Sequence, residues 1–179
     1  MSDTLVEGRQ VRRTRAAVLT AFRKLFLTRR YVEIRVADIV EGANVGRSTF
    51  YDHFAGKEDV LMVSMAPLLE PLADAAAGRG DYARVLAVLK HFREQTARAR
   101  AIFSSAVYFK LVDRLATMIA LGLLGAPDKE EAQAFAVEKS AAQFGLLRAW
   151  INGQLPLSAD QLAAKLIATG VRPYAFASK

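Results

Sequence analysis

Cysteine is absent from this chain of 179 residues, and histidine occurs only twice. Without cysteine the protein forms no disulfide and has no thiolate nucleophile, which fits a reducing compartment. An enzyme would have to use His91 with an acidic partner, or His53 with Asp52, but neither arrangement has the spacing of a known nucleophile or metal site. We therefore expect no catalytic residue, no metal and no cofactor.

Long hydrophobic runs are also missing. The longest apolar stretch without a charge, residues 115–127, is too short to cross a bilayer, and the N-terminus is too charged for a signal peptide. The sequence thus predicts a cytoplasmic protein with no membrane partner. Its hydrophobic content of 53% is nevertheless ample for a packed core, which excludes a disordered tail protein.

Glycine and proline mostly punctuate helical patterns, and no segment alternates as a strand would. We expect an all-α fold, with a three-helix head over residues 1–56 and a helical body over residues 57–179.

Positive charge is concentrated in the first third of the chain. Residues 1–57 hold 11 Lys and Arg against 6 Asp and Glu, a net of +5, whereas residues 58–179 hold 14 against 12, a net of +2. A basic excess favours a polyanionic partner, although charge alone also serves solubility.

Two short helical patterns around a tight turn occupy residues 36–54, VADIVEGANVGRSTFYDHF. The first has apolar residues at helical spacing, at Val36, Ile39, Val40 and Ala43. Asn44 then interrupts it, and Asn tolerates the left-handed backbone that a sharp turn between helices requires. A second helix is expected from about Arg47, with Phe50 and Phe54 facing inward.

The outward residues of this second helix suit the major groove of DNA. Arg47 is the best candidate to read a base, because a bidentate contact from arginine to guanine is the commonest specific contact. Ser48 and Thr49 are placed to touch a base edge, or only to start the helix. Lys57, which opens the next helix, has an ammonium that can hold a phosphate together with free backbone N–H groups.

The stretch GANVGRSTFYDHFAGKEDVL resembles the recognition-helix signature of the TetR family of bacterial transcriptional regulators. The resemblance covers Val18 to Leu61 and implies that Tyr51 and His53 hold phosphates; the alternatives are a half-buried packing ring and a structural turn histidine. The chain departs from the family at two positions. Arg30 replaces the usual helix-ending glycine, and Arg35 replaces the Thr or Ser that caps the second helix, although Arg35 can instead reach a phosphate.

Before this motif, residues 11–28 predict a helix with a buried stripe and several arginines on its other faces, which serve either as a solvated surface or as phosphate contacts. Residues 1–10 show no periodicity and are expected to form a mobile arm.

The body is expected to begin with a helix from Lys57 that Pro67 and Pro71 bend and interrupt. Further helices are predicted over residues 82–96, 100–107, 108–124, 128–152 and 159–169. Asp81, Asp128 and Ser158 are expected to cap three of them, the last in a capping box with Gln161.

The penultimate helix carries apolar and small residues around most of its circumference, which indicates burial on two sides. One side belongs to the body's own core. The family resemblance implies that the other side pairs with a second copy, so that a homodimer forms; the alternative is burial within one chain. The expected interface residues are Ala134, Val137, Ala141, Gly145, Leu162 and Leu166.

Aromatic residues and a thioether from several helices of the body are expected to converge on an apolar cavity for a small hydrophobic or aromatic effector. The candidates are Phe92, Phe103, Tyr108, Met118 and Phe144, and the alternative is that they simply fill the core.

Together, these features predict a homodimeric transcriptional regulator that binds a double-stranded DNA operator, more specifically a repressor released by an effector. The alternatives are a DNA-organising or partner-recruiting protein that has no effector, and a small-molecule enzyme.

Overall fold

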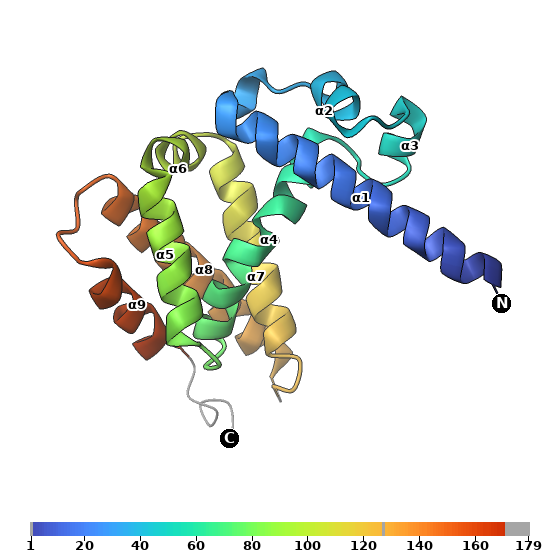
Figure 1. Cartoon of the computed structure of the whole chain (residues 1–179). Helices are drawn as coiled ribbons and strands as arrows, with labels where there is room; N and C mark the ends of the chain where they lie inside the picture. The colour runs from blue at the N-terminus through green and yellow to red at the C-terminus, as the bar shows by residue number, and fades with distance from the viewer. Residues whose placement is uncertain (1, 127, 171–179) are drawn as a thin grey trace. The chain divides into compact units, whose positions relative to one another are not determined.

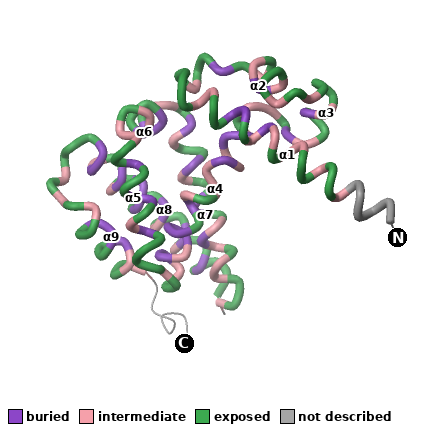
Figure 2. The backbone as a smooth tube through the Cα atoms, viewed as in Figure 1, coloured by how far each residue is buried: buried purple, intermediate pink, exposed green. Residues whose placement is uncertain are grey.

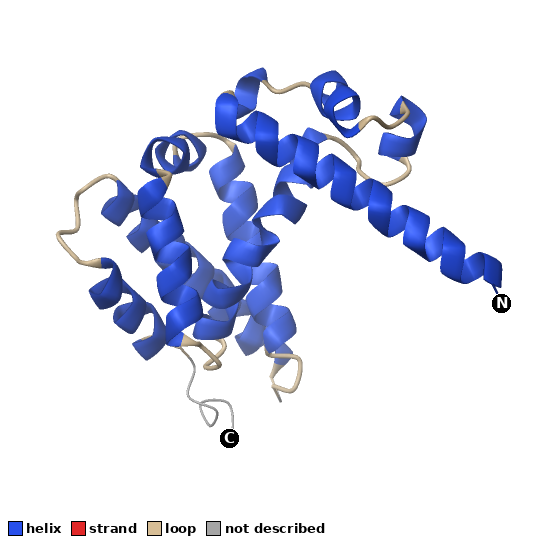
Figure 3. Ribbon diagram, viewed as in Figure 1, coloured by secondary structure: helices blue, strands red, loops and turns tan. Residues whose placement is uncertain are grey.

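The computed structural model describes residues 2–126 and 128–170, with side chains from Gly8 onward. Every regular element in these ranges is a helix, as Figure 3 shows, which confirms the all-α class. The elements are α1 (Ser2–Thr28), a 3-10 turn η1 (Tyr31–Glu33), α2 (Val36–Ala43), α3 (Arg47–Tyr51), α4 (Lys57–Ala76), α5 (Tyr82–Glu94), α6 (Thr96–Phe103), α7 (Val107–Gly122), α8 (Lys129–Ile151) and α9 (Ala159–Ala168).

The chain forms two compact units that divide inside α4, between Ala66 and Pro67 (Figure 1). We call the first unit the head and the second the body. This division lies ten residues after the boundary expected at residue 57.

The head is built on the buried stripe of α1. Val18 and Phe22 are fully buried, and α2 approaches α1 so closely that a Cβ on Gly42 would lie 3.3 Å from the Ala21 Cβ. The remaining core of the head comes from the other segments, through Ile34, Ile39, Phe50, Phe54, Val60 and Leu61. Each such side chain contributes about 1.5–3 kcal/mol when it leaves water.

The prediction of a mobile arm over residues 1–10 is wrong for residues 2–10, because α1 begins at Ser2. Residue 1 lies outside the described residues. Once residues 11–28 form a helix, each further residue adds a hydrogen bond without a new nucleation cost, and no proline stops the extension.

The expected interruption of α4 by its two prolines is also wrong, because the helix continues from Lys57 to Ala76 through both of them. An interior proline costs about 3 kcal/mol. At Pro71 burial offsets this cost, since Pro71 and Leu72 are buried together with Leu69, Ala73, Ala75 and Ala76, whereas Pro67 is exposed. Figure 2 colours the buried stretches of the chain purple.

The predicted helix caps of the body are confirmed. The Asp81 carboxylate accepts from the Arg84 N–H at 2.8 Å, and the Asp128 carboxylate accepts from the Glu131 N–H at 2.9 Å. Ser158 and Gln161 form the expected reciprocal box, with distances of 2.8 and 3.1 Å. Each of these caps satisfies an N–H group that the helix itself leaves unpaired.

Helix boundaries in the middle of the body differ from the expectation. A helix was predicted over residues 100–107, but α6 spans Thr96–Phe103 and α7 already begins at Val107. Packing decides this, because Ala99, Ile102 and Phe103 are buried together on one face of α6. No helix within the described ranges is long and apolar enough to span a membrane.

The left-handed residue at the head's turn provides a test of the local fold. Asn44 has φ +52° at the end of α2, whereas Asn152 ends α8 with φ −81°, and both are exposed. We expect Asn44→Val to lower the free energy of unfolding by about 1–2 kcal/mol, because a β-branched residue is strained at positive φ.

Urea unfolding followed by circular dichroism measures this loss. Asn44→Gly should remain near the wild type, and Asn152→Val is the matched control at negative φ. Equal losses for Asn44→Val and Asn152→Val would contradict the backbone explanation.

Candidate nucleic-acid interface

The turn between α2 and α3 has the geometry that the sequence predicted. Asn44 adopts the left-handed conformation, its N–H donates to the Glu41 carbonyl at 3.1 Å, and the Val45 N–H donates to the Val40 carbonyl at 3.2 Å. This pair of bonds satisfies the carbonyl groups that the end of α2 leaves open. The chain therefore leaves α2 in a defined direction and enters α3 at Arg47.

Helix α3 is short and is anchored by two aromatic rings. Phe50 and Phe54 are fully buried, with ring centres 5.7 Å apart. Their burial leaves Arg47 and Ser48 exposed, Thr49 half-buried and Tyr51 48% exposed. The predicted set of base-reading side chains thus lies on the solvent side of α3.

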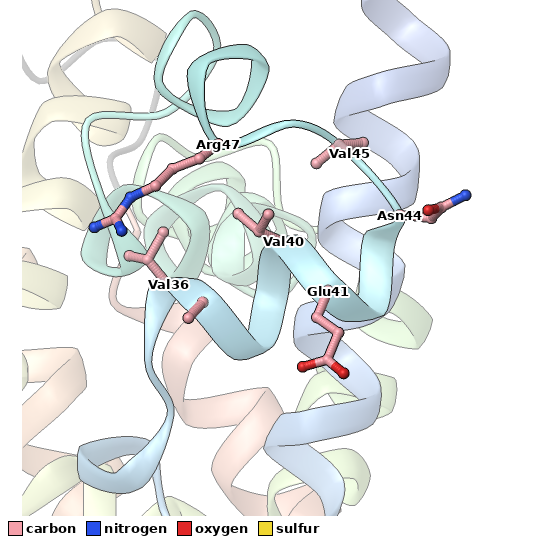
Figure 4. Close-up of a pocket in the computed structure, with 7 residues that line it drawn as sticks. Val36, Val40, Glu41, Asn44, Val45 and Arg47 are labelled. Atoms are coloured by element: carbon pink, nitrogen blue, oxygen red, sulfur yellow. The ribbon is translucent and has the colours of Figure 1, made fainter.

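Arg47 also lines an open groove of about 310 Å³ on the head. Figure 4 shows its side chain extending past Val36, with the guanidinium turned away from the Glu41 carboxylate. The guanidinium lies 6.0 Å from the centre of the Tyr51 ring. The groove is lined by Val36, Ala37, Val40, Glu41, Asn44, Val45 and Arg47.

The start of α2 shows how the missing Thr or Ser cap is replaced. Arg35 makes no side-chain cap, but its backbone N–H donates to the Asp38 carboxylate at 2.8 Å. This bond keeps the pKa of Asp38 below its usual value. The Arg29 guanidinium, which lies 3.1 Å from the same carboxylate, adds to the effect. The Arg35 side chain itself is exposed.

Arg30, which stands in place of the family's helix-ending glycine, is not held in the left-handed conformation. Its backbone is extended, with φ −68° and ψ 142°, and Asn44 alone among the non-glycine residues of the described ranges has a positive φ. Helix α1 ends with an ordinary bond from the Arg29 N–H to the Leu25 carbonyl at 2.8 Å.

The Lys57 side chain binds backbone carbonyl groups of the protein itself. The sequence predicted instead that it would point outward and hold a phosphate. Its ammonium donates to the carbonyl oxygens of Tyr31, Val32 and Ile34 at 3.2, 3.4 and 2.8 Å. It also lies 4.7 Å from the centre of the Tyr31 ring. Burial, with a smaller effect of Glu58, raises the pKa of this tyrosine to about 12.

Arg15 was expected only as part of a charged surface, either solvated or touching phosphate. Its guanidinium instead donates to the His53 carbonyl at 3.0 Å and lies 4.7 Å over the Phe54 ring. The sequence held a signal for this role, because Arg15 follows the spacing of the buried stripe through Val18 and Phe22. His53 itself is half-buried.

The predicted effector residues of the body converge in part. Phe103 lies at the centre, with its ring 5.8 Å from Phe92, 5.8 Å from Phe144 and 6.3 Å from Tyr108. The three phenylalanines are buried, and Tyr108 is half-buried. Met118 lies ten residues after Tyr108 on α7, about 15 Å along the helix, and is separate from this cluster.

The predicted interface residues fall into two groups. Ala134, Val137, Ala141 and Gly145 are exposed on α8, where they share one face. Leu162 and Leu166 are fully buried within their own chain, on a helix that packs against α5. The expectation that these two leucines contact a partner is therefore wrong for this conformation.

The model of the bacterial regulatory proteins of the tetR family matches residues 18–62. These residues contain the core of the head, α2, the turn and α3. Over these residues the chain belongs to the TetR family. Regulators of this family bind DNA.

The chain is similar to two curated relatives over less than half of its length. It is 40% identical over 55 residues to the HTH-type transcriptional regulator EthR of Mycolicibacterium smegmatis, a match that covers 31% of this chain and 25% of the relative. It is 36% identical over 74 residues to the uncharacterized HTH-type transcriptional regulator YxbF of Bacillus subtilis, covering 38% of this chain and 20% of that protein. The match therefore spans a quarter or less of these relatives.

The crystal structure of a TetR transcriptional regulator from Streptococcus agalactiae 2603V is similar over nearly the whole chain. The TM-score is 0.55 at 25% sequence identity, and the match covers 94% of this chain and 99% of that one. The likeness thus extends to the helices of the body, where the family model does not reach.

Proposed function

We propose that this protein is a homodimeric transcriptional repressor that binds a palindromic operator through α3 and is released by a small hydrophobic effector. The observation that carries the proposal is the pattern on α3, where Phe50 is buried while Arg47, Ser48 and Tyr51 face solvent. A helix presented in this way fits the major groove.

The exposed and half-buried groups around α3 each have a role on DNA. Arg47 reads a guanine through its two parallel N–H donors, and Ser48 with Thr49 touches a neighbouring base edge. Tyr51 and His53 hold phosphates, as the family resemblance implies, and Arg35 reaches a phosphate at the start of α2. Phosphate contacts set the register of the helix, and the base contacts supply specificity.

Dimerisation is supported by the exposed face of α8. A Cβ added at Gly145 would meet no atom within 4 Å, so packing within the chain does not require glycine there. Glycine in an exposed helix interior costs about 1 kcal/mol relative to alanine, which makes close approach of a partner helix a good reason for it. Large exposed apolar side chains also occur on α7 at Phe109 and Leu121, after α7 at Leu124, and on α8 at Val137.

An effector site is supported by the aromatic cluster around Phe103. Rings from α5, α6, α7 and α8 meet there, and a flat hydrophobic guest can exchange ring contacts with them. Helix α4 contributes residues to both units, and Pro67 at their division has no N–H for the helical ladder. A helix weakened at that point is a suitable element for an effector to bias.

The same head would also serve a DNA-organising protein without an effector. A repressor loses operator affinity when its effector binds, whereas the DNA-organising protein has no such response. The relatives named above are regulators rather than enzymes. A regulator that acts on the chromosome works in the bacterial cytoplasm.

The DNA contact of Arg47 is tested by Arg47→Ala. We expect this change to cost about 1–3 kcal/mol of operator binding and to relax the preference at one position of each half-site, because a bidentate base contact is lost. Selection from random duplexes followed by binding titrations measures both effects.

Arg12→Ala on the exposed face of α1 is the matched control for loss of one positive charge. If Arg47→Ala weakens binding to the operator and to random DNA equally, Arg47 contacts phosphate rather than a base.

The α8 interface is tested by Gly145→Trp. An indole on this face should prevent close approach of the partner helix, so the variant should be monomeric in light scattering at micromolar concentration, where the wild type is dimeric. Ala87→Trp, on an exposed face of α5, is the control for an added surface indole. A monomeric wild type, or a dimeric Gly145→Trp variant, would count against this interface.

The effector is tested by screening hydrophobic aromatic compounds for thermal stabilisation and then titrating each hit into the protein–operator complex. A hundredfold loss of operator affinity requires about 2.7 kcal/mol of differential binding. Phe103→Leu should change the affinity of the hits, whereas Phe109→Leu, at a side chain 70% exposed, should not. Hits that stabilise the protein without weakening operator binding would favour the function without an effector.

A further inference from the structure

The environment of Lys57 is unusual for a residue that opens a helix. A helix N-terminus carries partial positive charge and disfavours a cation there by about 0.3–1 kcal/mol. The two following residues, Glu58 and Asp59, have the favourable sign. A lysine in this position therefore needs compensating contacts nearby.

The segment before α2 supplies those contacts. An ammonium has three N–H donors, and three carbonyl oxygens, from Tyr31, Val32 and Ile34, lie within hydrogen-bond distance of Nζ. All three donors are used within the protein, and none is left for a DNA phosphate. Lys57 thus joins the start of α4 to the turn that precedes α2.

Arg15 makes a second connection of the same kind on the other side of the loop. It joins α1 to the His53 carbonyl, two residues after the end of α3, and its guanidinium covers the Phe54 ring. Residues 52–56 connect α3 to α4, and bonds from charged donors consequently hold this connection at His53 and at Lys57 directly after it. Such bonds are about twice as strong as neutral ones.

We propose that Arg15 and Lys57 are positioning residues for DNA recognition, which fix the orientation of α3 by holding backbone carbonyls around its exit loop. This inference rests on the proposed function, in which α3 contacts DNA. A helix of five residues is too short to hold its own geometry, so loosening its exit lets it lie at several angles to the bases. Specific binding suffers most, because it requires one angle.

The proposal and a phosphate contact predict different salt dependence. Loss of a phosphate contact reduces the slope of log K against log salt by about 0.9 for each phosphate released. Loss of a positioning residue leaves that slope unchanged and lowers the ratio of specific to nonspecific affinity. Lys57→Met in the whole chain removes all three donors while keeping an unbranched side chain only one atom shorter.

The experiment uses the operator that the wild type selects from random duplexes. For Lys57→Met we expect an unchanged salt slope, a specificity ratio lower by about tenfold, and faster hydrogen exchange of the Phe50, Asp52 and Phe54 amides without DNA. Lys24→Met, at an exposed position of α1, is the control for loss of one charge and should keep the wild-type ratio. Arg15→Met should reproduce the Lys57→Met result, and keeps the proposal testable if Lys57→Met does not fold.

Lys57→Arg separates the two roles further. Arginine is a good phosphate ligand, so this variant restores binding if Lys57 contacts DNA; its planar donors do not match three carbonyl groups around one point, so a positioning role is not restored. The proposal is overturned if Lys57→Met has a flatter salt slope than the wild type and Lys57→Arg binds the operator as the wild type does. The proposal is also overturned if Lys57→Met lowers the melting temperature but leaves the specificity ratio and the hydrogen exchange of α3 unchanged. That result would show a purely structural role for Lys57. A wild type that enriches no duplex contradicts the proposed function itself.

Discussion

The burial of Phe50 and Phe54 is the constraint on which the DNA-binding head depends. Helix α3 has five residues, and isolated helices shorter than about 12 residues are marginal in water. Phe50 within it and Phe54, three residues after its end, fix which side faces the core, and so which residues face outward. The left-handed Asn44 sets where the helix begins, and Arg15 and Lys57 hold the segment that follows it.

Helix α8 illustrates a second constraint, since its two faces meet different requirements. Ala136, Phe144 and Leu147 are buried in the body, while a stripe of small residues on the opposite face is exposed. Small residues on that stripe would allow a partner helix to pack closely, as we propose for the dimer. Gln143, on the inner face, donates to the Leu72 carbonyl of α4 at 3.2 Å, so α8 also contributes to holding the part of α4 that belongs to the body.

Sequence patterns predicted the elements whose signals are local. The turn at Asn44, the caps at Asp81, Asp128 and Ser158, and the inward rings of α3 depend on neighbours within a few residues, and each is found as expected. The failures have a non-local cause. Burial of Pro71 and its neighbours carries α4 through two prolines, and the buried face of α6 moves that helix four residues towards the N-terminus.

The sequence by itself determined the fold class, the family and the outward set on the recognition helix, because helical periodicity, turn chemistry and a short motif are properties of adjacent residues. Only the tertiary structure decided what the long side chains contact. Lys57 and Arg15 have the same charge as an exposed arginine, yet carbonyl groups from segments distant in the sequence engage both. Leu162 and Leu166 likewise have the spacing of an interface but are buried against their own chain. Such contacts join residues far apart in sequence, and periodicity along one helix carries no information about them.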